Sequence, residues 1–217
     1  MNEDQRAKVA SKILNRIYPK TPIPLKYKNN FTFLISVLLS AQCTDVNVNN
    51  VTKNIYTKYN KPDHFVKLGR KKIENLIKRI GIFRIKAKSI YLMSKQLIKD
   101  HKGKVPRNFD DLEKLPGVGH KTASVLMSQA FGYPAFPVDT HIHRLAQRWG
   151  LTSGKNVVQT EKDLKRLFPK KSWSKLHLQI IYFGREFCKA RDCYGISCKI
   201  CTKCYPKRKK RIITKKA

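Results

Sequence analysis

The sequence predicts an all-α protein. Apolar residues recur every three or four positions along most of its 217 residues, as they do on the buried face of a helix. Proline and glycine separate these stretches, for example at Pro19, Gly81, Pro116 and Gly132. No stretch shows the alternation of apolar and polar residues that is typical of a half-buried strand. We therefore expect helices joined by short loops, in one large domain or two small ones.

The first half of the chain contains six expected helices. The first ends at a proline-containing linker that begins at Pro19. We expect Asn30 to cap the second, whose apolar residues cover enough of its surface to place it in a core. Gly81 breaks a later helix, and the next one starts near Arg84, so that Ile82 lies on a loop. The expected spans are 4–18, 30–41, 51–59, 62–68, 71–79 and 86–100.

Residues 108–131 have the pattern of a helix-hairpin-helix motif. Asn108 is placed to cap the first helix, and Pro116 stops it. Gly117 and Gly119 permit backbone angles closed to other residues, and His120 opens the second helix. Backbone N–H groups in such a turn carry partial positive charge and suit a phosphate oxygen.

The last third of the chain contains three more expected helices and a cluster of cysteines. Asp139 opens the first of these helices as an N-cap, and Gly150 ends it. Five of the six cysteines fall between Cys188 and Cys204, while Cys43 is expected to be a small buried apolar residue. The segment 207–217 follows with seven basic residues, and we expect it to be a disordered arm that attracts DNA.

The charge of the chain indicates a polyanionic partner. Its 47 Lys and Arg against 14 Asp and Glu give a net charge of +33. Nucleic acid is the first candidate. The longest apolar run, 31–41, is too short to span a bilayer, and the N-terminus lacks the apolar segment of a secretory signal. We expect an intracellular, DNA-associated monomer, in a bacterial cytoplasm or a nucleus, without membrane contact.

Lys121, one residue past the hairpin, is a candidate nucleophile, and Asp139 opens a later helix. A neutral amine can attack C1′ of a deoxyribose, displace the base and form a Schiff base, after which β-elimination cuts the strand. The positive end of the helix at Lys121 disfavours a second positive charge and so favours that neutral amine. The alternatives are a phosphate-binding lysine and an aspartate that only caps its helix. Asp139, His141 and His143 are not expected to bind a metal, because a third ligand on the same face is missing.

The cysteine spacing predicts a metal centre. Cys198, Cys201 and Cys204 form a C-x2-C-x2-C run typical of a [4Fe–4S] site, and Cys188 can supply the fourth thiolate. Structural zinc is the alternative. The additional Cys193 leaves the choice of ligands open.

LPGVGHKTA followed by VDTHIHR resembles the signature of the endonuclease III family, and the resemblance covers about residues 30–204. It implies a two-lobed fold with a six-helix lobe at 23–133, a cluster lobe made of 1–22 and 134–206, and a C-terminal iron–sulfur loop. It also implies a DNA glycosylase and abasic-site lyase that removes oxidised pyrimidines, with Lys121 and Asp139 as catalytic residues. The family pattern C-x6-C-x2-C-x5-C differs from the spacing in this chain.

The resemblance further implies DNA contacts outside the hairpin glycines Gly117 and Gly119. Gln42 would reach into a damaged or abasic duplex, and Ile82, where the family has leucine, would fill the gap left by the extruded base. Two other functions compete with this interpretation. A monofunctional adenine glycosylase would lack a lysine at position 121, and a non-enzymatic DNA-binding module would need the hairpin and a metal clip alone.

Overall fold

The computed structural model describes residues 1–217 and confirms an all-α protein, with helices and no strand. It divides into two compact units, residues 23–133 and residues 1–22 with 134–217. Each unit has its own apolar core. None of the helices combines the length and the apolar composition needed to cross a membrane.

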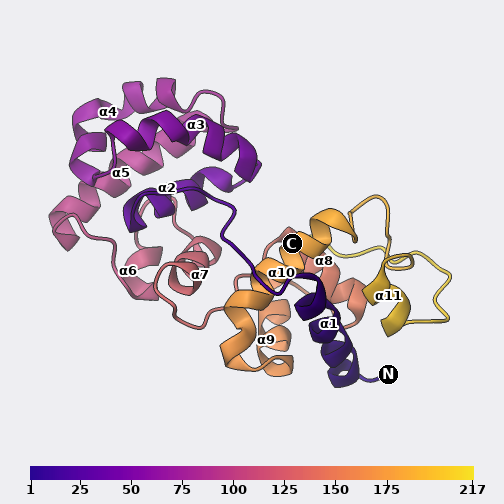
Figure 1. Cartoon of the computed structure of the whole chain (residues 1–217). Helices are drawn as coiled ribbons and strands as arrows, with labels where there is room; N and C mark the ends of the chain where they lie inside the picture. The colour runs from indigo at the N-terminus through magenta and orange to yellow at the C-terminus, as the bar shows by residue number, and fades with distance from the viewer. The chain divides into compact units, whose positions relative to one another are not determined.

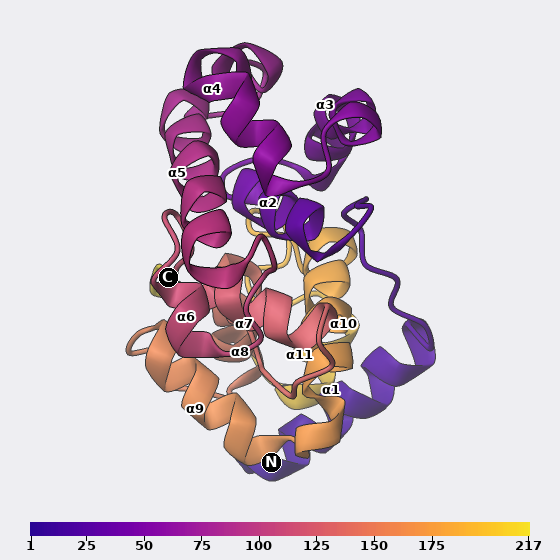
Figure 2. The same cartoon turned by 90° about the vertical axis from the view of Figure 1, so that its left-hand side faces the viewer.

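The unit of residues 23–133 is built around helix α2, Asn30–Ser40, which packs against α3 and α7 (Figures 1 and 2). Every residue of α2 from Phe31 to Leu39 is buried. The predicted cap was one residue late. Asn29 is the N-cap, and its side chain and that of Thr32 accept hydrogen bonds from each other's backbone N–H groups. The other helices of this unit are α3 (Asp45–Lys58), α4 (Pro62–Leu76), α5 (Phe83–His101), α6 (Phe109–Glu113) and α7 (His120–Gln129).

Two of these helices differ from the predicted bounds. α3 begins at Asp45 rather than at residue 51, because the Thr44 hydroxyl accepts a hydrogen bond from the backbone N–H of Asn47 at 3.3 Å and caps it. α4 covers the predicted helix 62–68 and most of the predicted helix 71–79, and it ends at Leu76, three residues early. Gly69, with φ 72° and ψ 158°, interrupts its helical geometry, so the predicted break between the two is confirmed.

The unit of residues 1–22 and 134–217 brings the two ends of the chain together. Its elements are α1 (Glu3–Ile17), α8 (Thr140–Trp149), α9 (Val157–Leu167), the 3-10 helix η1 (Lys170–Ser172), α10 (Trp173–Glu186) and α11 (Lys199–Cys204). α1 packs against α10 and α11, and α8 packs against α10 (Figure 1). Phe136, Trp149 and Phe183 are fully buried in this core.

Residues 207–217 form no helix or strand, but they are hydrogen-bonded to the unit that contains them. The Arg208 guanidinium donates to the carbonyls of Arg148 and Gly195 at 2.7 and 3.0 Å. The Lys215 backbone N–H donates to the side chain of Gln147 at 2.8 Å. The prediction that this segment is a disordered, DNA-attracting arm stays a prediction.

Candidate active site and metal centre

The hairpin between α6 and α7 depends on Gly117. Its φ of 81° lies in the left-handed region, and a Cβ there would stand 2.7 Å from Cβ of Ser89 and 3.1 Å from Leu38. Asn108 caps α6 as predicted, with its side-chain oxygen accepting from the Asp111 backbone N–H at 2.8 Å. Gly117 is therefore required by backbone angle and by the close approach of α2 and α5.

Gly119 has a different reason to be glycine. Its φ of −94° with ψ 176° is extended backbone open to any residue, so the predicted need for a special angle is wrong at this position. A Cβ at Gly119 would meet no atom within 4 Å. Since internal packing does not demand a glycine, the missing side chain leaves room for an external group to approach the first N–H groups of α7.

Lys121 is exposed in the first turn of α7. No side chain caps this helix, and its first turn contains no acidic residue, so its N-terminal N–H groups are available to an anion. The preceding His120 stacks on Phe109 with ring centroids 5.7 Å apart, and its Nδ1 lies 2.7 Å from Oε1 of Glu113. These contacts hold the start of α7 against α6.

Asp139 is the N-cap of α8, as predicted. Its Oδ1 accepts a hydrogen bond from the Ile142 backbone N–H at 2.8 Å, and its side chain is half-buried. The cap uses one of the two carboxylate oxygens. A carboxylate held in this way keeps a fixed position at the positive end of its helix. Lys121 belongs to the unit of residues 23–133 and Asp139 to the other unit.

Gln42 and Ile82 share an unusual backbone conformation. Both have positive φ, 55° and 50°, although neither is glycine. Both are exposed, and Ile82 retains 50% of its accessible surface. The predicted loop position of Ile82 is confirmed, since it directly precedes α5. A β-branched residue in the left-handed region is strained, so the surrounding structure must hold the backbone of Ile82 in this conformation.

The structure gathers four buried cysteines: Cys188, Cys193, Cys198 and Cys201. Their sulfur atoms all lie within 4.8 Å of one another, with Sγ of Cys201 at 4.0 Å from that of Cys188 and 3.8 Å from that of Cys193. Hydrogen bonds from the neighbouring thiols, that of Cys188 first, lower the pKa of Cys193. Four close thiols of this kind can hold a metal ion or cluster.

Cys204, the last cysteine of the C-x2-C-x2-C run, lies outside this group. It ends α11, where burial raises its pKa to about 11, and the charges of Arg6 and Arg208 act in the opposite direction. Its sulfur is not among the four that lie within 4.8 Å of one another, whereas that of Cys193 is.

Two arginines on α8, the buried Arg148 and the half-buried Arg144, contact the cysteine loop and were missed by the sequence analysis. Arg148 donates to the carbonyls of Lys189 and Ala190, both at 2.8 Å, and Arg144 donates to the carbonyl of Cys188 at 3.1 Å. The helix capped by Asp139 is thus tied along one side to the metal centre. Their spacing of four residues, which places both on one face of α8, is the signal that could have identified them.

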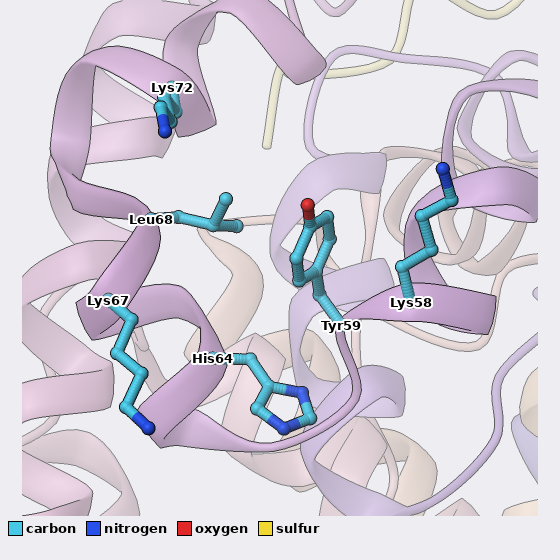
Figure 3. A pocket seen from close by; sticks show the side chains of 6 residues that line it. All are labelled: Lys58, Tyr59, His64, Lys67, Leu68 and Lys72. Carbon is cyan, nitrogen blue, oxygen red and sulfur yellow. The ribbon is translucent and has the colours of Figure 1, made fainter.

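The pocket shown in Figure 3 is separate from these residues. It has a volume of about 220 Å³ and lies between α3 and α4, with the side chains of Lys58, Tyr59, His64, Lys67, Leu68 and Lys72 around it. Its lysine side chains point in different directions in Figure 3 and do not converge on one point. We assign it no function.

Comparison with known proteins identifies the family. Residues 35–170 match the model of the HhH-GPD superfamily of base excision DNA repair proteins. The chain is 43% identical to endonuclease III of Bacillus subtilis over 189 residues, which cover 87% of this chain and 86% of that protein. It is 39% identical to endonuclease III of Escherichia coli over 210 residues, 96% of this chain and 99% of the relative. The chain belongs to the endonuclease III family.

Solved structures agree with this membership. A trapped covalent intermediate of endonuclease III with DNA superposes with a TM-score of 0.87 and 39% identity, over 94% of this chain and 99% of that one. A thermostable thymine-DNA glycosylase gives a TM-score of 0.78 at 25% identity, over 90% of this chain and 94% of that one. A protein of the endonuclease III family is a DNA glycosylase and abasic-site lyase. The resemblance found in the hairpin motif is thereby confirmed, and the non-enzymatic module is not supported.

Proposed function

We propose that this protein removes oxidised pyrimidines from double-stranded DNA and cuts the strand at the resulting abasic site, with Lys121 as the nucleophile. The observation that carries the proposal is the position of Lys121, exposed in the first turn of an uncapped helix directly after the glycine hairpin. The hairpin N–H groups would bind a phosphate and so bring the sugar to the amine.

The chemistry proceeds in two stages. The neutral Nζ of Lys121 attacks C1′, the C1′–N bond breaks, and the base leaves with the bonding electron pair and takes up a proton. The amine loses its protons and the ring C1′–O4′ bond opens, so that a Schiff base joins Nζ to C1′. Loss of the C2′ proton then expels the 3′ phosphate oxygen, and water finally releases the enzyme. Asp139 would stabilise the positive charge that grows on the sugar.

Borohydride trapping tests the nucleophile. We expect Lys121→Ala to abolish the covalent product with a duplex that contains an abasic site, because no amine remains to form the reducible imine. Lys114→Ala is the matched control, since Lys114 is an exposed lysine on the same hairpin, with 69% of its side chain accessible. Trapping that persists in Lys121→Ala would remove this residue from the mechanism. Duplexes with thymine glycol, 8-oxoguanine or uracil would show which bases are excised.

The metal centre is a [4Fe–4S] cluster held by Cys188, Cys193, Cys198 and Cys201. Four buried thiols in one loop supply the ligands that such a cluster takes. When bound, it acts as a structural clip, because the lysine chemistry needs no redox step. Zinc is the second candidate for a specific reason. Sulfur separations of 3.8 and 4.0 Å match the edge of a tetrahedron around a single ion bound at about 2.3 Å.

Metal analysis of two serine variants decides the ligands and the metal. Cys193→Ser should lose bound metal, whereas Cys204→Ser should keep it. Four iron atoms per protein molecule and a brown colour would support the [4Fe–4S] cluster. One zinc ion per molecule in a colourless protein would show that the site binds zinc instead. Metal that is retained in Cys193→Ser and lost in Cys204→Ser would overturn the proposed ligand set.

A further inference from the structure

Two loops of the unit 23–133 lie next to each other although they are about forty residues apart in the chain. They are residues 41–44, which contain Gln42, and residues 79–82, which contain Ile82. A Cβ placed on Gly81 would lie 3.5 Å from the backbone oxygen of Gln42. The two non-glycine residues with positive φ in these loops are therefore neighbours, and both are exposed.

Lys86 lies at the base of both loops. It is only 4% exposed, and its Nζ donates to the backbone oxygens of Leu39 and Ala41, at 3.0 and 2.5 Å. These carbonyls end α2, where the helix leaves acceptors without partners and carries partial negative charge. The Lys86 backbone N–H makes the ordinary helical bond to the oxygen of Ile82 at 3.2 Å, at the start of α5. The Lys86 side chain therefore joins the helix that follows Ile82 to the backbone that precedes Gln42.

The burial of this ammonium has a physical cost. Loss of water contact lowers the pKa of Lys86, while the nearby Cys43 acts in the opposite direction. An apolar residue would fill the same position without that penalty, so the benefit of lysine lies in its bonds to the two carbonyls.

Asn47 makes a second connection between the loops. Its side-chain amide donates to the backbone oxygen of Arg79 at 3.1 Å and to Sγ of Cys43 at 3.2 Å. Neither Lys86 nor Asn47 belongs to the hairpin or to the cysteine loop. Their hydrogen bonds converge instead on the backbone around Gln42 and Ile82.

We propose that Lys86 is a positioning residue for base extrusion, which holds Gln42 in its left-handed conformation next to Ile82, so that the Gln42 side chain stands ready to enter the duplex. The inference rests on the proposed DNA contacts of Gln42 and Ile82. Without the ammonium, a left-handed Gln42 would relax toward ordinary backbone angles. The rate of excision, which requires a stacked base to be extruded, should then fall more than the rate of strand cutting at a site that has already lost its base.

Two substrates separate this role from a general loss of structure. Lys86→Met is compared with Lys88→Met, which removes the same charge from an exposed position on the same helix. Excision of a damaged base and cutting of a pre-formed abasic site are measured per active molecule, as counted by borohydride trapping. We expect excision by Lys86→Met to fall on the order of tenfold or more, with little change in abasic-site cutting. Lys88→Met should not change the ratio of the two rates.

A double variant tests whether Lys86 acts through Gln42. If it does, Lys86→Met combined with Gln42→Ala should excise no more slowly than Gln42→Ala alone. Equal loss of both activities in Lys86→Met, or additive losses in the double variant, would overturn the inference while leaving the function of Lys121 intact. Unchanged excision by Gln42→Ala would remove the proposed role of Gln42 and the inference with it. If Lys86→Met does not fold, Asn47→Ala must show the same selective loss of excision, and an unchanged ratio there would refute the loop pairing.

Discussion

The two duties of Asp139 can be separated by two substitutions at the same position. Its Oδ1 caps α8 through the Ile142 N–H at 2.8 Å. Asparagine caps a helix about as well as aspartate, whereas alanine removes the cap and lowers the free energy of unfolding by about 1 kcal/mol. For a chain of this length, that loss corresponds to a decrease in melting temperature of about 2–4 °C.

The charge is the other duty. Asp139→Asn keeps a side-chain oxygen for the cap but has no negative charge to stabilise the sugar cation. We expect Asp139→Asn to melt close to the original protein, with only a few tenths of a kcal/mol lost from the helix dipole. Its excision rate should fall on the order of a hundredfold, the magnitude typical of the loss of one electrostatic group in a catalytic site.

Thermal unfolding and single-turnover excision on the same preparations test this separation. Asp139→Ala should lose both stability and activity, and Asp139→Asn should lose activity alone. If Asp139→Asn excises as fast as the unchanged protein, Asp139 is a cap and nothing more. If Asp139→Asn melts as low as Asp139→Ala, the reasoning about the cap is wrong.

Two further perturbations test the fold around the site. Gly117→Ala should lower the free energy of unfolding by about 1–3 kcal/mol in a denaturant titration, because its Cβ would stand 2.7 Å from Cβ of Ser89. Gly119→Ala should change the free energy of unfolding by no more than about 0.5 kcal/mol, yet it should weaken DNA binding. Equal losses of stability in the two variants would contradict this account of the hairpin. Burial lowers the pKa of His143 below its ordinary 6.5, while a hydrogen bond that its ring donates to the backbone of Lys216 acts in the opposite direction. Since the unfolded chain then binds the proton more tightly, stability should fall as the pH decreases below about 6.5, and His143→Gln should remove this contribution; an unchanged pH slope would refute it.

Much of the fold was predictable because local signals agreed with the packing. The caps at Asn108 and Asp139 and the stop at Gly150 use side chains or backbone angles that act within a few residues. The start of α3 was missed because Thr44 stands in a polar stretch where periodicity gives little information. The N-cap of α2 was predicted at Asn30 and lies at Asn29. An error of one residue is within the usual uncertainty of helix ends.

The site was less predictable where it depends on contacts across the chain. Nothing local shows that Lys86 turns inward to the carbonyls of α2, since a lysine in a basic helix ordinarily faces water. The choice between Cys193 and Cys204 depends on how the cysteine loop folds, and spacing alone cannot show that Cys193 lies within the group of close thiols. The roles of Lys121, Gln42 and Ile82 remain predictions from the resemblance.

The shared unit of the two chain ends has a consequence for synthesis. Residues 23–133 are contiguous and can close on themselves as soon as they leave the ribosome. α1 is translated before this unit and its partners α10 and α11 after it, so its apolar side stays exposed until those helices have been made. In that interval α1 is open to chaperones and proteases.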